Sequence, residues 1–388
     1  MNTYARLPVA FVRGEGVWLW DELGNRYLDT VAGVAVNGVG HAHPRLVKAI
    51  TEQATLLHTS NLYRIPLQEQ LADRLCQISS METAFFCNSG AEANEAAIKL
   101  ARLYGHRRGI EIPTIIVMEK AWHGRTIATL SATGNRRAQA GFEPLVAGFV
   151  RVPYNNMDAV RAVAEHHRNI VAVLMEPIQG EGGINEADVV FQEELYAFCR
   201  EQEWFYMLDE VQTGIGRTGH WFAFQHSGVQ PDVLILAKGL GSGVPIGACL
   251  ARGLAARLFE PGHHGSTFGG NPLVCAAALA TLAIMDEEGL LGNAKIQGER
   301  LKQGLQQGLA GVSGFIEVRG QGLMLGVELA YPCGELVAQA LKAGLLLNVT
   351  SEKVIRLIPP LIIKSQEIDQ ILLQLLPLVR AFLQRVAS

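Results

Sequence analysis

The sequence lacks paired cysteines, long apolar runs and a leader-like N-terminus. Its six cysteines contain no CxxC pair, which favours reduced, mostly buried thiols in a cytosolic protein. No apolar run reaches the length of a membrane span. Met1–Arg13 has no basic stretch followed by an apolar one, so we expect a cytoplasmic protein. The cysteines are Cys76, Cys87, Cys199, Cys249, Cys275 and Cys333.

Blocks of basic residues are also missing. The chain carries 33 Lys and Arg against 37 Asp and Glu, for a formal net charge of −4. This balance is not that of a protein with a basic surface for binding nucleic acid. We therefore expect neither nucleic acid nor a membrane as a partner. The adjacent histidines at 166–167 and 263–264 lack the i, i+4 spacing of a helical metal site, so no metal is expected.

What the 388-residue chain does contain is an alternation of strand and helix patterns. This alternation predicts an α/β fold, with a mostly parallel central sheet flanked by helices. We expect a large domain over residues 45–290 and a smaller α+β domain formed by residues 1–44 and 291–388. The clearest strand patterns are Thr114–Met118, Val171–Met175, Phe205–Leu208 and Val233–Leu236, and the clearest helical ones are Ala91–Tyr104, Gln192–Glu203 and Gln366–Val386.

Two of the expected strands end in residues suited to chemistry. Asp209 follows the run Phe205–Leu208, at the sheet edge where open α/β folds bind ligands, although it could simply cap the next helix. Lys238 ends another apolar run and precedes a glycine-rich turn. Desolvation lowers the pKa of a lysine and makes its amine nucleophilic, as a Schiff base requires. The alternative is a lysine that reaches to solvent.

One glycine-containing turn is a candidate anion site, and another matches a dinucleotide-binding pattern that its context does not support. The turn at residues 88–90 opens a long expected helix, whose first amides and dipole suit a phosphate, unless Ser89 is an ordinary cap. Gly214–Gly219 matches the dinucleotide pattern GxGxxG. A nicotinamide enzyme is nevertheless disfavoured, because no helix of small residues follows and no acid lies about 20 residues further on.

Taken in order, the motifs resemble the class III (ornithine-type) aminotransferases, which have fold type I of enzymes that depend on pyridoxal 5'-phosphate (PLP). The resemblance runs nearly end to end, and the combination is far more specific than any single motif. It is carried by Arg13-Gly-Glu-Gly, Gly40-His-Ala-His-Pro, His58-Thr-Ser-Asn-Leu-Tyr, Asn88-Ser-Gly-Ala-Glu-Ala-Asn, Trp122-His-Gly-Arg-Thr, Glu176-Pro-Ile-Gln-Gly-Glu-Gly-Gly, Asp209-Glu-Val-Gln-Thr-Gly, Lys238, Ser266-Thr-Phe-Gly-Gly-Asn-Pro and Arg356-Leu-Ile-Pro-Pro.

The resemblance implies roles for the cofactor-binding residues. Lys238 would hold PLP as a Schiff base and then act as general base and acid. Asp209 would pair with the pyridine nitrogen and keep it protonated. The backbone at Gly90 and Ala91 would hold the phosphate, in agreement with the anion-site argument. Further implied contacts to the cofactor come from Trp122, Glu210, Val211, Gln212 and Thr267.

Three of these further contacts have a specific implied role. Trp122 would stack on the ring, and Gln212 would reach its hydroxyl group. Thr267 would bind the phosphate from the neighbouring subunit. The resemblance therefore implies a homodimer with shared active sites.

The resemblance also implies how the substrate carboxylates are bound. Arg125 would bind the carboxylate far from the reacting carbon, and Arg356 the glutamate α-carboxylate, both through bidentate pairing. Glu181 would neutralise Arg356 while an ω-amine substrate is bound and move aside for glutamate. Ser266 and Tyr4 are lesser candidates for substrate contact. Taken singly, each arginine could equally form a surface salt bridge.

Within the family, the resemblance implies N2-acetyl-L-ornithine as amino donor and 2-oxoglutarate as acceptor, giving N-acetyl-L-glutamate 5-semialdehyde and L-glutamate. The features that favour this pair are a short N-terminus, the segment His58–Tyr63 and the tail Leu345–Thr350. Ornithine, succinylornithine, succinyldiaminopimelate and 4-aminobutyrate remain alternative donors. A glutamate-1-semialdehyde aminomutase and a non-enzymatic PLP-binding regulator remain alternatives of other classes.

Overall fold

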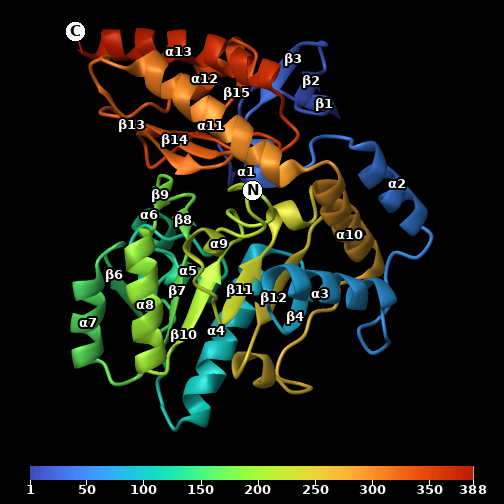
Figure 1. The fold of residues 1–388 in the computed structure, drawn as a ribbon, viewed down its shortest axis with the longest axis vertical. Helices are drawn as coiled ribbons and strands as arrows, with labels where there is room; N and C mark the ends of the chain where they lie inside the picture. Colours follow the sequence, from blue (N-terminus) through green and yellow to red (C-terminus); the bar gives the residue numbers. More distant parts are fainter. Residues whose placement is uncertain (388) are drawn as a thin grey trace.

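The computed structural model describes residues 1–387, and its centre is a seven-stranded sheet. In spatial order, its strands are β4 (Thr83–Cys87), β12 (Gly247–Ala251), β11 (Val233–Leu236), β10 (Phe205–Asp209), β7 (Ile170–Met175), β5 (Thr114–Met118) and β6 (Phe149–Val152). All neighbours are parallel except at β12, which is antiparallel to both β4 and β11. This sheet occupies the lower part of Figure 1.

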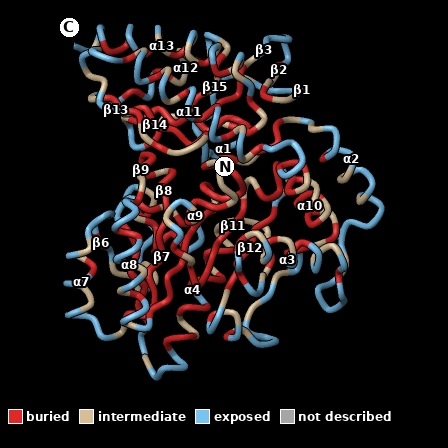
Figure 2. The backbone as a smooth tube through the Cα atoms, in the orientation of Figure 1, coloured by how far each residue is buried: buried red, intermediate tan, exposed pale blue. Residues whose placement is uncertain are grey.

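Both faces of the central sheet are buried. Every residue of β7 and β10 is buried. Along β10, successive apolar residues belong alternately to two separate clusters, as the two faces of a pleated strand require. Helix α4 (Gly90–Arg107) covers one face with buried alanines, whereas α8 (Val189–Glu201) packs into the cluster of the other face. Figure 2 shows buried segments in the interior and exposed ones around the periphery.

The remaining elements around the central sheet are mostly helices. They pack on its two faces and, at the right of Figure 1, beside β12 and β4. They are α2 (Pro44–Gln53), α3 (Pro66–Ser79), α5 (Ile127–Ala132), α6 (Arg136–Gln139), α7 (Met157–His166), the short hairpin β8 (Ile178–Gln179) and β9 (Asn185–Glu186), α9 (Phe224–Ser227), the 3₁₀ turns η1 (Lys238–Leu240) and η2 (Ala255–Arg257), and α10 (Pro272–Glu287).

Two smaller sheets lie above the central one and combine both ends of the chain (Figure 1). The first consists of β1 (Phe11–Glu15), β2 (Trp18–Asp21), β3 (Arg26–Asp29) and β15 (Leu345–Leu346), with β15 parallel to β3. The second is an antiparallel sheet of β13 (Phe315–Gln321), β14 (Met324–Leu329), β17 (Val354–Leu357) and β16 (Asn348–Thr350). The helices of this region are α1 (Ala32–Ala35), α11 (Leu290–Leu309), α12 (Leu336–Lys342) and α13 (Ser365–Ala387).

The α/β fold with a mostly parallel central sheet is confirmed. The strands predicted at 114–118 and 233–236 match β5 and β11 residue for residue. The antiparallel strand β12 was not identified, because Gly247-Ala-Cys-Leu-Ala is rich in small residues and lacks the branched side chains typical of strands. The division into domains at residues 44 and 290 stays a prediction.

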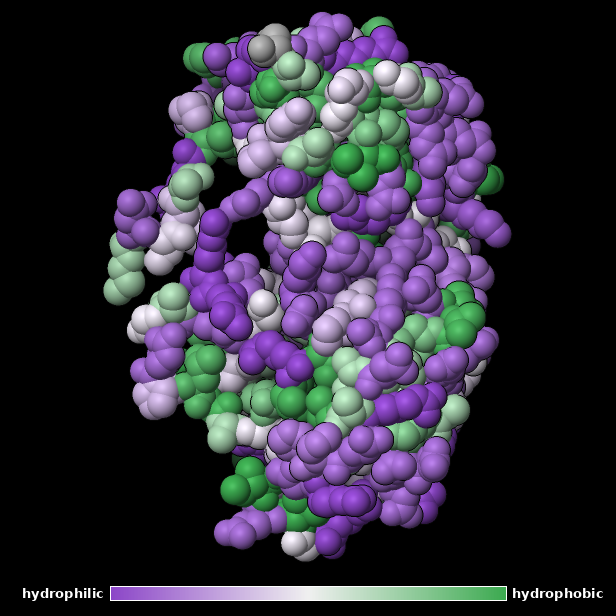
Figure 3. All heavy atoms as spheres, turned by 90° about the vertical axis from the view of Figure 1, so that its left-hand side faces the viewer, coloured by the Kyte–Doolittle hydropathy of each residue, from purple (hydrophilic) through white to green (hydrophobic). Residues whose placement is uncertain are grey.

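The surface is a mixture of polar and apolar side chains. Figure 3 shows one face, on which hydrophilic residues predominate and hydrophobic ones form separate patches. Within residues 1–387, no helix is long and apolar enough to cross a membrane. The same residues contain no group of three or more His, Cys, Asp or Glu side chains that could hold a metal ion.

Candidate active site

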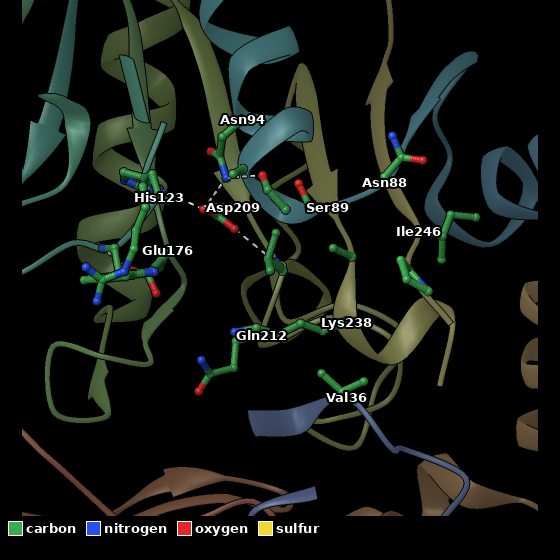
Figure 4. A pocket seen from close by; sticks show the side chains of 18 of the residues that line it. Val36, Asn88, Ser89, Asn94, His123, Glu176, Asp209, Gln212, Lys238 and Ile246 are labelled. Carbon is green, nitrogen blue, oxygen red and sulfur yellow. Dashed lines mark hydrogen bonds and ion pairs between the residues drawn. The ribbon is translucent and has the colours of Figure 1, made fainter. Parts of the chain in front are cut away.

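A cavity of about 540 Å³ lies at the carboxyl ends of β10 and β11 and at the N-terminus of α4. It brings together residues from distant parts of the sequence, and Figure 4 shows their side chains converging. Open α/β sheets bind ligands at this position. Among the residues singled out from the sequence, those that line the cavity are Gly90, Ala91, Trp122, Arg125, Asp209, Val211, Gln212 and Lys238.

Asp209, the last residue of β10, is the anionic centre of the cavity. Its carboxylate is 3% exposed and is held from three sides. Oδ2 accepts a hydrogen bond from Asn94 Nδ2 at 2.8 Å and lies 2.8 Å from His123 Nδ1, while Oδ1 accepts one from the Val211 amide at 3.0 Å. The first two contacts are drawn as dashed lines in Figure 4. This fixes the orientation of the carboxylate, which can serve as partner for a cation.

His123 and Glu176 extend this buried polar network. The Nε2 atom of His123 is buried without a hydrogen-bond partner. Glu176 accepts hydrogen bonds from the Trp122 amide at 2.8 Å and the Gly180 amide at 3.0 Å. Burial raises the pKa of Glu176 to about 7, an effect that His123 opposes and the charge of Asp209 reinforces.

Three residues of this network were not predicted from the sequence, namely His123, Glu176 and Asn94. All of them line the cavity. Each also lies inside a motif that carried the family resemblance, Trp122-His-Gly-Arg, Glu176-Pro-Ile or Asn88-Ser-Gly-Ala-Glu-Ala-Asn. Motif membership was therefore the available signal, because nothing in their local sequence indicates contact with Asp209.

Lys238 follows β11 and begins the turn η1, where its φ of 44° places the backbone in the left-handed region. Such a backbone conformation is uncommon for a residue other than glycine and is frequent at functional sites. Burial lowers the pKa of the Lys238 ammonium, an effect that Glu181 opposes and Arg356 reinforces. Within residues 1–387 its amine has no hydrogen-bond or ion-pair partner, so it is available as a nucleophile.

The N-terminus of α4, where the sequence predicts an anion site, lines the cavity. Ser89 caps the helix by accepting a hydrogen bond from the Glu92 amide at 3.2 Å. The first amides of the helix, at Gly90 and Ala91, have no intrahelical acceptor and line the cavity. A Cβ atom at Gly90 would lie 2.8 Å from the Val211 side chain, so this close approach requires glycine.

Arg356, on β17, lies beside the cavity and is 1% exposed. Its Nη1 donates to Glu181 Oε1 at 2.6 Å and to Gln212 Oε1 at 3.2 Å. Its Nε and Nη2 both donate to Asn348 Oδ1, at 3.1 and 2.7 Å. The structure thus places Glu181 against Arg356, as the family resemblance implied. Gln212, which lines the cavity, connects this pair to the site.

Arg125, in contrast, is exposed and lies over the face of Trp122, with its guanidinium carbon 4.7 Å from the ring centroid. Within residues 1–387 it has no carboxylate partner. One arginine near the cavity therefore lacks a carboxylate partner within residues 1–387, whereas the other is paired with Glu181.

Besides Glu181 and Arg356, which pair with each other beside the cavity, four predicted residues do not line it. Glu210 is buried, but it accepts hydrogen bonds from the amides of Ala223 and Phe224, because strand neighbours point to opposite faces. Burial raises its pKa to about 7. The other three are Tyr4, which is 72% exposed, Ser266, which accepts from Asn88 Nδ2 at 3.3 Å, and Thr267, which is exposed.

These groups fit PLP, a planar cofactor with one phosphate and a basic ring nitrogen. The free amides of α4 suit the phosphate, and the buried carboxylate of Asp209 suits a protonated nitrogen. Trp122 offers an aromatic face, and Lys238 an unpaired amine of lowered pKa.

Comparisons with known proteins show which family the chain resembles. Residues 1–378 match the family described as Aminotransferase class-III. An acetylornithine aminotransferase from Nitrosomonas europaea is 60% identical, over 99% of this chain and 98% of its own. The structure of ornithine aminotransferase from Toxoplasma gondii superposes with a TM-score of 0.95 at 33% identity and covers 99% of this chain and 93% of its own. That of N-acetylornithine aminotransferase from Stenotrophomonas maltophilia gives 0.86 at 34% identity, with 99% of both chains covered. The chain therefore belongs to the class-III aminotransferase family.

Proposed function

We propose that this chain is an acetylornithine aminotransferase of arginine biosynthesis. It would transfer the δ-amine of N2-acetyl-L-ornithine to 2-oxoglutarate and yield N-acetyl-L-glutamate 5-semialdehyde and L-glutamate. The observation that carries the proposal is the contrast between a free Arg125 and a neutralised Arg356 at one cavity. The 60% identity to the Nitrosomonas europaea protein of that name supports the choice of donor.

The two arginines suit two substrates that differ in carboxylate number. Acetylornithine presents one carboxylate far from its reacting amine, which Arg125 would bind. Glutamate presents two, and its α-carboxylate would replace Glu181 on Arg356. While the donor is bound, Glu181 keeps Arg356 neutralised, because an unpaired buried guanidinium beside an apolar methylene chain would be unfavourable.

Lys238 and Asp209 would supply the reactive groups. PLP, when bound, withdraws electrons from the substrate carbon that loses its proton. Asp209, fixed by Asn94 and His123, would hold the proton on the ring nitrogen. The Lys238 amine would accept the proton lost from the amine-bearing carbon of the substrate and would later give that proton up as a general acid. Burial favours its neutral form, which is the form that accepts a proton.

We also propose a cytoplasmic homodimer. Large apolar side chains are exposed in two adjacent segments, with Leu62 at 88%, Tyr63 at 71% and Phe268 at 60% exposure. The segments are joined by hydrogen bonds from Asn61 Nδ2 to the Ser266 and Gly269 carbonyls. Burying such residues against a second copy would stabilise a dimer. Thr267, next to Phe268, would then bind the phosphate in the neighbouring subunit. Sedimentation of the cofactor-loaded protein as a monomer at micromolar concentration would contradict this proposal.

A screen of half-reactions tests the function. Each candidate donor is mixed with the PLP-loaded protein, and conversion of the cofactor is followed by its visible absorbance. Acetylornithine should react with a higher kcat/KM than ornithine, succinylornithine, succinyldiaminopimelate or 4-aminobutyrate. After the donor has reacted, the original absorbance of the cofactor should return only when 2-oxoglutarate is added. Turnover of a semialdehyde without any 2-oxo acid would instead indicate an aminomutase.

A further inference from the structure

A second cavity of about 490 Å³ adjoins the active site. It shares Trp122 with the first cavity, and Glu181 contributes to its wall. One side is formed by the segment after β5 and the start of α6, and the other by the loop between β16 and β17. Its polar lining residues besides Glu181 are Lys120, Asn135, Arg136, Arg137, Ser351 and Glu352.

Both carboxylates that line this second cavity are already paired. Glu352 Oε1 lies 2.6 Å from Arg137 Nη1, and Glu181 Oε1 lies 2.6 Å from Arg356 Nη1. The backbone oxygen of Glu181 also accepts a hydrogen bond from the Thr350 hydroxyl, which holds this loop in place. No carboxylate of the cavity is therefore left to neutralise a further cation.

Two cations of the same cavity are unpaired. Within residues 1–387, the side chains of Lys120 and Arg136 have no hydrogen-bond or ion-pair partner, although both are exposed. Arg136 also lowers the pKa of nearby Arg151, in addition to the larger effect of burial. Arg125, which lies over Trp122 at the wall shared by the two cavities, also lacks an ion-pair partner. Within residues 1–387, these three cations without ion-pair partners therefore line the two cavities, in a chain whose net charge is −4.

We infer that Lys120 and Arg136 form an outer anion-binding subsite that captures the dicarboxylate 2-oxo acid before it reaches Arg125 and Arg356. The inference rests on the proposed function. A dianion such as 2-oxoglutarate is attracted to both cations. Acetylornithine carries one carboxylate and one ammonium, so its net attraction to them is small. Charged walls raise the local concentration and association rate of a ligand of opposite sign. The subsite therefore favours the acceptor over the donor.

Salt dependence tests the inference on the unaltered holoenzyme. Raising the ionic strength from about 20 to about 300 mM shortens the range of the attraction to a few ångströms. The kcat/KM for 2-oxoglutarate should fall about three- to tenfold, and that for acetylornithine less than about twofold. An equal response of both substrates would overturn the inference.

A double variant then assigns the effect to the two residues. Lys120→Ala/Arg136→Ala should lower kcat/KM for 2-oxoglutarate about three- to tenfold at low salt, remove most of the salt dependence and leave kcat unchanged. The matched control is Arg168→Ala/Lys364→Ala, which removes the same charge from exposed residues that line neither cavity. If both double variants lose activity equally, or if the salt dependence persists, the inference fails.

Two further measurements keep the outcome unambiguous. Lys120→Arg/Arg136→Lys keeps the charges and should retain the wild-type preference even if the alanine variant is unstable. Glutarate, an unreactive dicarboxylate, should inhibit the Lys120→Ala/Arg136→Ala protein several-fold less strongly than the wild type, and equal inhibition would contradict the subsite. A wild-type protein that does not use 2-oxoglutarate at all would refute the proposed function rather than this inference.

Discussion

Replacing Glu181 by alanine should shift the choice between the two amino substrates. Arg356 is 1% exposed and donates to Glu181 at 2.6 Å. In the variant, Asn348 and Gln212 still accept hydrogen bonds, but no carboxylate balances the guanidinium. Removing one partner of a fully buried pair costs about 3–5 kcal/mol. Because the Glu181 side chain is 33% exposed, roughly half of this cost is expected.

About 1.5–2.5 kcal/mol corresponds to a factor of about 10–60 in the ratio of kcat/KM values. The kcat/KM for glutamate should rise, because its α-carboxylate no longer competes with Glu181 for Arg356. The kcat/KM for acetylornithine should fall, because this substrate leaves the guanidinium of Arg356 unpaired. The ratio of kcat/KM for glutamate to that for acetylornithine should therefore rise by this factor, measured as two half-reactions through the visible absorbance of the cofactor.

A matched variant, Glu203→Ala, removes an exposed glutamate that pairs with Arg108 at 3.0 Å, away from the cavity, and should leave the ratio unchanged. A Glu181→Ala protein that is fully loaded with PLP and keeps the wild-type ratio would refute the reasoning. The reciprocal variant, Arg356→Ala, should slow the glutamate half-reaction more than the acetylornithine one. Equal losses would show that Arg356 does not distinguish the substrates.

The remaining predictions concern the cofactor and the buried acids. Lys238→Ala should abolish the visible absorbance of lysine-bound PLP and lower turnover at least about 100-fold, and an active variant would end the assignment of Lys238. Gly90→Ala should weaken PLP binding about tenfold, because its Cβ would meet Val211 at 2.8 Å. Gly292→Ala, where nothing lies within 4 Å, is the control in the same absorbance titration. The raised pKa of Glu176, about 7, means that the folded protein holds this proton more tightly than the unfolded chain. Stability is therefore lost as pH rises from about 4.5 to about 7, by up to roughly 3 kcal/mol. Thermal unfolding of the cofactor-free Glu176→Gln protein should depend less on pH in this window than that of the wild type, and identical profiles would argue against the buried proton.

The central sheet could be predicted because its signals are local. Runs such as Thr114–Met118 and Val233–Leu236 are buried on both faces and therefore continuously apolar. Asp209 and Lys238 could be singled out for the same reason, since each follows such a run. The strand β12 could not, because its small residues give no strand pattern and its direction depends on its neighbours.

The polar contacts of the site could not be predicted, because they join residues far apart in the sequence. Asn94 and Asp209 are separated by 115 positions, and Glu181 and Arg356 by 175. A family resemblance can imply such a pair, as it did for Glu181 and Arg356. The orientation of Glu210, which turns away from the cavity to bind two amides, also depends on the packing around it.

The parallel pairing of β15 with β3 has a consequence for the order of folding. The Leu28 amide donates to Gly344 at 2.9 Å, and the Thr30 amide donates to Leu346 at 3.2 Å. During synthesis, more than three hundred further residues must be added after β3 before its partner β15 exists. The central sheet and Lys238 emerge earlier, so a nascent chain could assemble the cofactor pocket before Arg356 is made. We therefore expect the ability to bind PLP to appear before the ability to recognise glutamate.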